Sequence, residues 1–320
     1  MRIDQPEPDE PDGGSTGRGD VSDRGDHGAD TGRPRRRWEA PAVSREEQIA
    51  AHARNRETVE ATYQAAAGYR AAADRDAWAE AVPRLRDAWD EHKERYPERM
   101  RASPRTETDG SWVCGEYRGL DPEQNTEASK AHADLADEAD RDILPALRRI
   151  EAADPERRLA GLEHMVKGED RLKEKLADEL FGKNKTVREA LGEVPDAIRF
   201  TLCYPHGHYA ESVLADVDRL KAEGFELIKL KNLWSDNQYK GINSQWRRLE
   251  TGSRFEMQFH TPESLEAKEL THQAYERIRG SDATPTERRE ARAFQRQVNA
   301  LLPIPLGTDR IKDYPEKTDG

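Results

Sequence analysis

Residues 254–261, which read RFEMQFHT, constrain the fold more tightly than any other stretch of this chain. With the two-residue period of a β-strand, this stretch has one apolar and one polar face. The apolar face consists of Phe255, Met257 and Phe259, and the polar face consists of Glu256, Gln258 and His260. A helix start follows at once, which favours a central strand. Because buried carboxylates need charged partners or a metal ion, the polar face of a central strand is typical of a functional site, whereas a solvent-facing strand is the alternative.

The composition indicates a polar, acidic protein with room for one large domain or two small ones. The 320 residues carry a net charge of −12, and 36% of them are charged. This balance argues against a protein that clamps nucleic acid over its whole surface, but it is compatible with a local basic pocket. The two cysteines are too few for a disulfide framework. No apolar run reaches transmembrane length and no secretory signal begins the chain, so we expect a cytoplasmic protein that does not bind membranes.

Shifts in composition divide the chain into four predicted regions. They are a disordered tail (1–44), a helical accessory or regulatory region (45–154), an α+β domain (155–302) and a loose C-terminal tail (303–320). The first tail is rich in Asp, Gly, Pro and Arg and has too few apolar residues to offset the entropy of ordering.

Apolar residues at spacings of three and four predict that the second region is all-helical. The predicted helices span residues 44–74, 76–96 and 127–150. We expect Pro83 to kink or split the second of these helices. Residues 97–123 contain Pro, Gly and Thr and are predicted to form an irregular connector.

The third region alternates between strand and helix. The predicted strands span residues 197–204, 225–231, 242–249 and 254–261, and the predicted helices span 168–176, 209–223, 262–279 and 285–301. The order β-α-β-β-β with flanking helices predicts an α+β fold, in which helices cover a mixed sheet of four to five strands.

Carboxylates, lysines and a tyrosine in this region form a candidate site. Asp196 precedes the first predicted strand and Glu256 lies on the polar face of the last, and two carboxylates from separate strands suit Mg²⁺. The loop before the third strand contains Tyr239, whose ring suits stacking on a nucleobase. The lysines that suit a polyphosphate are Lys167, Lys173 and Lys175. The combination predicts Mg-dependent phosphoryl chemistry on a nucleotide, driven by positioning and electrostatic stabilisation.

Each of these residues also has a purely structural interpretation, and only their joint occurrence favours a functional site. An i,i+4 pair of Glu169 with Lys173 would support a solvated helix. The structural interpretations are a solvated helix face for Lys173 and Lys175, a turn for Asp196, a packed loop anchor for Tyr239 and a satisfied histidine for His260.

An ordered set of motifs runs through residues 160–280. The motifs are Lys167-x7-Lys175, Asp196-Ala197-Ile198-Arg199, Tyr239-Lys240-Gly241-Ile242-Asn243 and the strand from Phe255 to Thr261. This set resembles the synthetase domain of the RelA/SpoT family, and it looks closest to the divergent branch found in small alarmone synthetases and toxin modules. Members of the family are ATP:nucleotide 3′-pyrophosphotransferases with a nucleotidyltransferase-like fold.

The resemblance implies a role for each matching residue. Asp196 and Glu256 would hold Mg²⁺, and Glu256 would also help to activate the 3′-hydroxyl group of the acceptor. ATP would donate its β,γ-pyrophosphate and leave as AMP, without a covalent enzyme intermediate. The residues expected to bind ATP are Lys167, Lys173, Lys175 and Arg199, and those expected at the acceptor are Tyr239, Asn243, Gln258 and His260.

The sequence departs from the family pattern at four positions. They are Met165 and His260, where the family usually has arginine, Asn243, where it has histidine, and Arg171, where serine is common. These departures leave the base of the acceptor nucleotide open. The first half of the chain has no His-Asp hydrolase signature, so we expect no companion hydrolase.

Other functions fit the same residues. The chemistry could be aimed at the 3′-end of tRNA, which Arg247, Arg248 and Arg254 modestly support. Pro195-Asp196 and Glu256-x-Gln258 loosely match the Pro-Asp…Glu-x-Lys pattern of metal-dependent nucleases, without its lysine. A non-catalytic nucleotide-binding module is a further alternative. The expected partners are ATP and an acceptor nucleotide or tRNA, together with an antitoxin or a regulatory protein.

Overall fold

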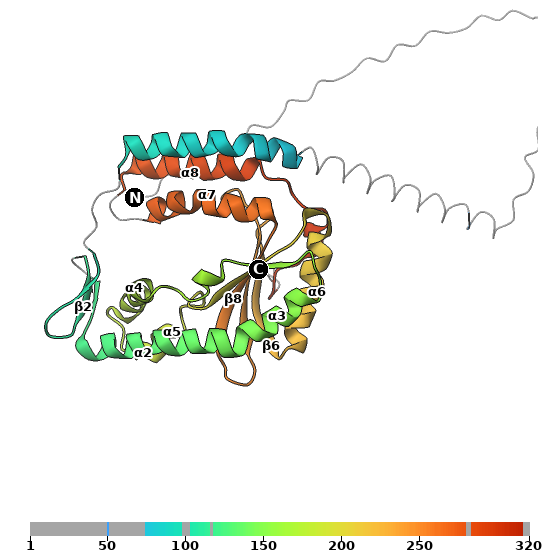
Figure 1. The fold of residues 1–320 in the computed structure, drawn as a ribbon. Coiled ribbons are helices and arrows are strands. Elements are labelled where there is room, and N and C mark those ends of the chain that lie inside the picture. Colours follow the sequence, from blue (N-terminus) through green and yellow to red (C-terminus); the bar gives the residue numbers. More distant parts are fainter. Residues whose placement is uncertain (1–49, 51–73, 98–102, 116–117, 280–282, 316–320) are drawn as a thin grey trace, which may run out of the picture. The chain divides into compact units, whose positions relative to one another are not determined.

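The computed structural model describes residues 50, 74–97, 103–115, 118–279 and 283–315 (Figure 1). By its contacts the chain divides into two units, Met1–Arg54 and Asn55–Gly320. The tail predicted over residues 1–44 and most of the helix predicted over 44–74 lie outside the described residues.

A five-stranded mixed sheet organises the second unit, as the sequence predicted. Its strand order is β4-β5-β8-β7-β6, with β5 and β8 parallel and the other neighbours antiparallel. The strands are β4 (Arg158–Ala160), β5 (Arg199–Cys203), β6 (Phe225–Asn232), β7 (Ile242–Arg248) and β8 (Arg254–His260). The stretch with two unlike faces is therefore the central strand β8, which confirms the prediction.

Helices flank this sheet. They are α2 (Pro122–Glu138), a π-helical turn η1 (Ala139–Ile143), α3 (Leu144–Ala152), α4 (Glu169–Leu180), α5 (Val187–Leu191), α6 (Tyr209–Ala222), α7 (Pro262–Arg279) and α8 (Pro285–Ala300). Short 3₁₀ turns are η2 (Leu162–His164), η3 (His206–His208) and η4 (Thr308–Arg310). None of the helices in the described ranges is long and apolar enough to cross a membrane.

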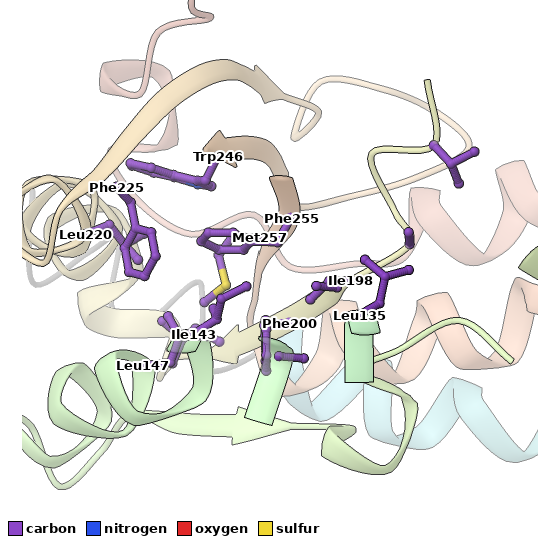
Figure 2. Packing of buried hydrophobic residues seen from close by; sticks show 14 of the residues in the cluster. Leu135, Ile143, Leu147, Ile198, Phe200, Leu220, Phe225, Trp246, Phe255 and Met257 are labelled. Atoms are coloured by element: carbon purple, nitrogen blue, oxygen red, sulfur yellow. The ribbon is translucent and has the colours of Figure 1, made fainter. Parts of the chain in front are cut away.

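The apolar face of β8 lies in the main core (Figure 2). Phe255, Met257 and Phe259 are fully buried, which confirms the period-two prediction. The helical segment from α2 to α3 contributes Leu135 and Leu147 to the same core. Residues on both sides of the predicted boundary at 154/155 therefore share one hydrophobic core.

A small antiparallel sheet stands where the sequence predicted an irregular connector. Its strands are β1 (Arg105–Thr106), β2 (Trp112–Cys114) and β3 (Arg118–Leu120), in the order β1-β2-β3. The prediction that residues 45–154 are all-helical is therefore wrong. A turn with Gly110 at φ +91° joins β1 to β2, and the buried Trp112 donates a hydrogen bond of 3.0 Å to Asp170 of α4. This docking on α4 stabilises strands that are too short to stand alone.

The helix over residues 74–95 continues through Pro83, which contradicts the predicted split. Pro83 has no N–H group to donate to the carbonyl group of Ala79, four residues earlier in the helix. Both residues are exposed, so water can donate to that carbonyl group instead. The helix packs with α7 and α8 in a second core, which contains Trp78, Trp89 and Phe294 (Figure 1).

The prediction of a loose C-terminal tail is wrong over residues 303–315. Leu230 of β6 and Tyr314 exchange two backbone hydrogen bonds, of 2.8 and 2.9 Å. The Asn232 side-chain amide donates to the carbonyl oxygens of Thr308 and Ile311. The segment thus covers the outer edge of β6 through backbone pairing, which leaves little trace in side-chain patterns.

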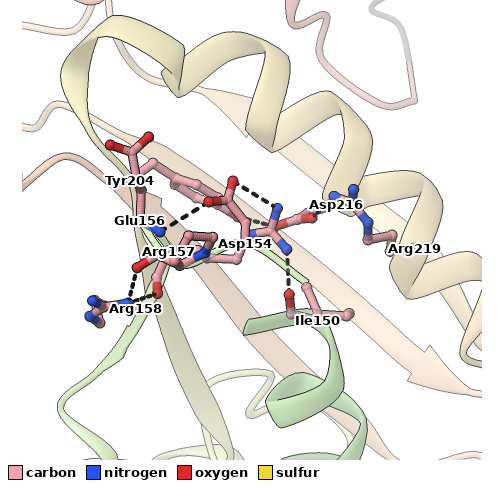
Figure 3. A network of polar contacts seen from close by, with 9 residues as sticks. Ile150, Asp154, Glu156, Arg157, Arg158, Tyr204, Asp216 and Arg219 are labelled. Atoms are coloured by element: carbon pink, nitrogen blue, oxygen red, sulfur yellow. Dashed lines mark hydrogen bonds and ion pairs between the residues drawn. The ribbon is translucent and has the colours of Figure 1, made fainter. Parts of the chain in front are cut away.

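A buried polar network ties four segments together beside the sheet (Figure 3). The Arg157 side chain is 2% exposed and the Asp216 side chain is 0% exposed, and Arg157 Nε lies 2.9 Å from Asp216 Oδ2. Tyr204 donates a 2.8 Å hydrogen bond to the same carboxylate, Arg219 lies 2.6 Å from its other oxygen, and Arg157 donates to the Ile150 carbonyl. Burial raises the pKa of Asp216, and the hydrogen bonds from Arg219 and Tyr204 oppose this effect. The network joins α3, the segment before β4, the end of β5 and α6.

Candidate active site

The polar face of β8 continues onto both neighbouring strands. In the register of the sheet, Glu256 lies beside Arg199 of β5 and Gln245 of β7. One row further along, Gln258 lies beside Thr201 and Asn243. Because side chains at paired positions share a face, the sheet brings Arg199, Glu256, Gln258 and Asn243 together.

Asp196 lies just before β5 and is held by two of the predicted lysines. Lys167 Nζ lies 2.9 Å from Asp196 Oδ2, and Lys175 Nζ lies 3.9 Å from Oδ1. Lys167 is fixed in turn because its backbone N–H donates to the Ala197 carbonyl. Burial acts to raise the pKa of Asp196, but the hydrogen bond and charge of Lys167 hold this pKa below its ordinary value. Asp196 is therefore a carboxylate at neutral pH.

Glu256 is the second carboxylate of the site. Its Oε1 atom accepts a 2.7 Å hydrogen bond from Gln258 Nε2. Burial raises the pKa of Glu256, the negative charge of Asp196 raises it further, and Arg199 opposes both effects. The two predicted carboxylates are thus close enough to repel each other. The Arg199 guanidinium acts on both electrostatically and, among the described residues, has no hydrogen-bond partner.

A chain of hydrogen bonds fixes the predicted acceptor residues. The Tyr239 hydroxyl group lies 2.8 Å from Asn243 Oδ1 and 2.7 Å from His260 Nε2, and His260 Nδ1 lies 2.9 Å from Ser264 Oγ. Since Asn243 Oδ1 can only accept, Tyr239 donates to it and His260 carries its proton on Nε2. Ser264 then donates to His260 Nδ1. Both nitrogens of His260 are occupied within the protein, so its contact with an acceptor stays a prediction.

Gly241 allows the loop to approach His260 this closely. The residue has φ +150°, and a Cβ atom there would lie 2.9 Å from His260 Cε1 and 3.1 Å from the Phe259 carbonyl oxygen. Lys240 secures the same loop by donating to the carbonyl oxygens of Trp234 and Asp236. Tyr239, which is half-buried, therefore lies on a loop that Lys240 holds in place.

The buried histidines predict a loss of stability in mild acid. Burial lowers the pKa of His260 far below 6.5, and burial also lowers the pKa of His92 and of His206. The unfolded chain therefore binds more protons below pH 6.5, and each histidine costs up to about 1.4 kcal/mol per pH unit until its native pKa is reached. We expect the thermal midpoint to fall between pH 7.5 and 5.5. His92→Gln should reduce this fall and His164→Gln, at an exposed position, should not; equal slopes in all three proteins would contradict the assignment.

Lys173 faces away from the other predicted ATP ligands. Its Nζ atom lies 2.8 Å from Glu169 Oε1, which confirms the expected i,i+4 pair, but the residue is only 5% exposed rather than solvated. Glu169 also accepts from Ser129 of α2, so Lys173 lies against α2. Lys173 and Lys175 are two residues apart on a helix and point to nearly opposite sides. The role of Lys173 in binding ATP stays a prediction, and the packing of this side chain against α2 does not favour it.

The arginines that supported binding of tRNA are paired within the protein. Arg247 lies 2.5 Å from Glu226, Arg248 lies 3.0 Å from Glu250, and Arg254 donates to the Gly192 carbonyl oxygen. Two of the three positive charges, those of Arg247 and Arg248, are therefore paired with carboxylates, which weakens the case for a basic surface beside the site.

Sequence reasoning missed Lys268, which reaches the site from α7. Its Nζ atom donates a 2.7 Å hydrogen bond to Gln258 Oε1. Burial, followed by the positive charge of Arg199, lowers the pKa of Lys268 to about 8. Its i,i+4 spacing from Ser264 puts the two residues on one side of α7, but only the packing of α7 shows that this side contacts the polar face of β8.

Comparison with solved structures finds remote matches. A GTP pyrophosphokinase family protein from Streptococcus pneumoniae is 13% identical, with 56% of this chain and 85% of that chain covered and a TM-score of 0.33. Small alarmone synthetase 1 from Bacillus subtilis is 12% identical, with 55% of this chain and 88% of that chain covered and a TM-score of 0.35. Small alarmone synthetase 2 from the same organism is 13% identical, with 56% of this chain and 92% of that chain covered and a TM-score of 0.34. No family model and no curated protein matches the sequence. At these scores the likeness identifies no family, and the site residues themselves must indicate the function.

Proposed function

We propose that the protein transfers pyrophosphate from ATP to the 3′-hydroxyl group of a nucleotide. One observation carries this proposal: two carboxylates that repel each other, Asp196 and Glu256, meet the cationic side chains of Lys167, Lys175 and Arg199 at one end of a sheet. Such a mixture of charges suits a phosphoryl group in transfer, where catalysis depends on positioning and on stabilising charge.

The cations provide a binding surface for the donor. Lys175 is 41% exposed at its side chain, and the Arg199 guanidinium has no hydrogen-bond partner among the described residues, so both can reach a polyphosphate. Lys167 is paired with Asp196 and would orient that carboxylate as well as add positive charge. The reaction needs these groups because negative charge collects on the phosphate oxygens as the pyrophosphoryl group moves.

The donor set of the site fits Mg²⁺. Two carboxylates, those of Asp196 and Glu256, lie at this site. Within the described residues there is no group of three or more His, Cys, Asp or Glu side chains that could hold a metal ion without other ligands. Mg²⁺ is often held by one or two carboxylates together with waters and substrate phosphates, and a cation would relieve the repulsion that raises the pKa of Glu256. Asp196 and Glu256 would hold the ion, which supplies positive charge to the phosphate oxygens when bound.

Glu256 would assist the acceptor. Its Oε1 atom is occupied by Gln258, whereas Oε2 has no hydrogen-bond partner among the described residues. In the proposed reaction the 3′-oxygen bonds to the β-phosphorus of ATP, the bond from that phosphorus to the α,β-bridging oxygen breaks, and AMP leaves with this oxygen. Glu256 accepts the hydroxyl proton and returns it to solvent. Burial raises the pKa of Glu256 above its ordinary value, which makes this carboxylate a stronger base than an exposed one.

The test uses ATP labelled at the γ-phosphate, with Mg²⁺ and the full-length chain, in separate tubes with GDP, GTP, ADP or bulk tRNA. Label that appears on one acceptor together with equimolar AMP would support the proposal and name the substrate class. Label on tRNA would favour the tRNA-directed form of the reaction. Cleavage of nucleic acid without transfer would favour a nuclease, and nucleotide-dependent thermal stabilisation without AMP would favour a binding module.

A synthetase of this kind would act on growth. Alarmone synthesis consumes ATP and an acceptor nucleotide, so we expect that expression of the intact chain slows growth and that Glu256→Gln relieves this effect. An antitoxin or a regulatory partner would then restore growth without a change in the site. Equal growth with the wild type and with Glu256→Gln would contradict a toxic role. The transfer reaction itself is tested by the assay with labelled ATP.

Tyr239 provides a separate prediction for the acceptor. Tyr239→Ala should raise the apparent KM for the acceptor about tenfold or more, because stacking on a base contributes about 1–3 kcal/mol, and should leave the KM for ATP almost unchanged. Tyr239→Phe is the matched control, since it keeps the ring and removes only the hydroxyl group bound to Asn243 and His260. Steady-state kinetics measure both; equal effects of Tyr239→Ala on the two substrates would remove Tyr239 from the stacking role.

A further inference from the structure

We propose that Lys268 is a positioning residue for Glu256, because it fixes the Gln258 side-chain amide in the one orientation that donates to the Glu256 carboxylate. What Glu256 then does rests on the function proposed above. The orientation itself is a property of the folded protein and can be measured without substrate.

The hydrogen bonds leave Gln258 no alternative orientation. Lys268 Nζ donates to Gln258 Oε1 at 2.7 Å, and Gln258 Nε2 donates to Glu256 Oε1 at 2.7 Å. An ammonium group has only donors and an ionised carboxylate has only acceptors. An amide between the two must therefore direct its oxygen to the lysine and its NH₂ group to the glutamate. Without the ammonium group, the bond to the carboxylate alone orients the amide, so Gln258 can leave this position more readily.

Burial makes this constraint effective. Gln258 is 5% exposed and Lys268 is partly buried, so bulk water cannot easily replace the lysine as a donor. A hydrogen bond that involves a charged group is stronger than a neutral one, and each bond in a chain polarises the next. The ammonium group thus strengthens the bond from Gln258 to Glu256 as well as orienting it.

The helix that carries Lys268 is held firmly from its other side. Trp78 Nε1 donates to Glu266 at 3.1 Å, and Trp89 Nε1 donates to Gln273 at 2.9 Å. Ala267 is buried in the same second core. Because a site residue is precise only when its support is rigid, this double docking of α7 suits a positioning role.

Fixing Gln258 has a direct consequence for Glu256. Its Oε1 atom stays with the amide, so Oε2 is the oxygen that remains for the reacting group. Loss of the lysine would free the Gln258 amide and with it the Glu256 carboxylate to rotate. We therefore expect a loss in the chemical step rather than in binding of ATP.

The kinetic test compares Lys268→Met, Lys268→Arg and a matched surface control, Lys221→Met, whose lysine is exposed and paired with Asp218. Residues that orient a reacting group typically contribute about 10–100-fold to activity, so Lys268→Met should lower kcat by about this factor with the KM for ATP unchanged within about twofold. Lys268→Arg should recover part of the loss, and Lys221→Met should match the wild type. A wild-type kcat for Lys268→Met would overturn the proposal.

The second readout does not depend on activity. In protein labelled with ¹⁵N-glutamine, the side-chain NH₂ resonances of Gln258, assigned by their loss in Gln258→Leu, should shift and exchange faster with solvent in Lys268→Met but not in Lys221→Met. Unchanged resonances would overturn the proposal even if the wild type proved inactive with every acceptor, an outcome that would reject the proposed function alone. If Lys268→Met fails to fold, Lys268→Ala replaces it, since it also removes the donor to Gln258 Oε1 and should shift the same resonances and speed their exchange.

Discussion

Glu256→Gln is expected to abolish pyrophosphate transfer while leaving the fold intact. The substitution removes the charge at nearly constant shape, and loss of a general base together with a ligand for a cation should lower kcat by about a thousandfold. The hydrogen bond from Gln258 can persist, because the new amide oxygen still accepts it. Since burial and Asp196 raise the pKa of Glu256, ionising it in the fold costs free energy, so the neutral variant should unfold at an equal or higher temperature.

Glu226→Gln is the matched control. Glu226 lies on β6 of the same sheet and pairs with Arg247 at 2.5 Å, with both side chains 43% exposed. Its substitution should change neither the transfer rate nor the thermal midpoint appreciably, because exposed ion pairs contribute little. Label transfer from ATP and differential scanning calorimetry measure the two quantities. A wild-type rate in Glu256→Gln would rule out Glu256 as the reacting carboxylate.

Arg157→Met is expected to destabilise the protein by about 3–5 kcal/mol, because it leaves Asp216 as a buried carboxylate without its buried partner. Tyr204 and Arg219 remain, but the Arg219 side chain is 42% exposed and its charge is partly screened by solvent. The pKa of Asp216, already raised by burial, should rise further. Below that pKa Asp216 becomes neutral in the folded variant, so the destabilisation should shrink as the pH falls.

Arg310→Met is the matched control, because it removes an arginine that pairs with another carboxylate of α6, in this case at an exposed position. Arg310 lies 2.7 Å from Glu211 of α6, with both side chains more than half exposed, so its loss should cost less than about 1 kcal/mol. Urea unfolding followed by circular dichroism compares the two variants at pH 7.5 and pH 5.5. Equal losses for Arg157→Met and Arg310→Met would show that burial does not set the strength of the pair.

The sequence was most informative where one local pattern decides the structure. The alternation in residues 254–261 predicted both faces of β8 and its central place, because a strand with three buried aromatic or sulfur-containing residues has only one way to face the core. Asp196 and Lys167 could likewise be predicted from the sequence, since Asp196 directly precedes a predicted strand and Lys167 directly precedes a predicted helix. These two stretches account for both carboxylates of the candidate site.

The misses come from interactions between distant residues. The strands β1–β3 contain two or three residues each, which is too short for a period to be visible. Tyr314 pairs with Leu230 through backbone groups, and because these groups are nearly the same in all residues, the sequence does not indicate such a pair. Lys268 lies on a correctly predicted helix, but which side of that helix meets the sheet is decided by packing. The separation of Lys173 from Lys175, by contrast, follows from their spacing alone, because residues two apart on a helix point to nearly opposite sides.

The shared main core sets a limit on how this chain can be shortened. A fragment that begins at residue 155 would lack the segment from α2 through η1 to α3, whose Leu135, Ile143 and Leu147 share the main core with the central strands. It would expose Phe200 and Phe255 to water and should aggregate rather than act as a free-standing catalytic module. A fragment that begins at residue 98 is a milder change, because the described part of the segment it loses is the helix over residues 74–95, which packs with α7 and α8 and contributes no residue to the main core. Inactivity of the shorter fragment would therefore say nothing about the chemistry of the intact protein.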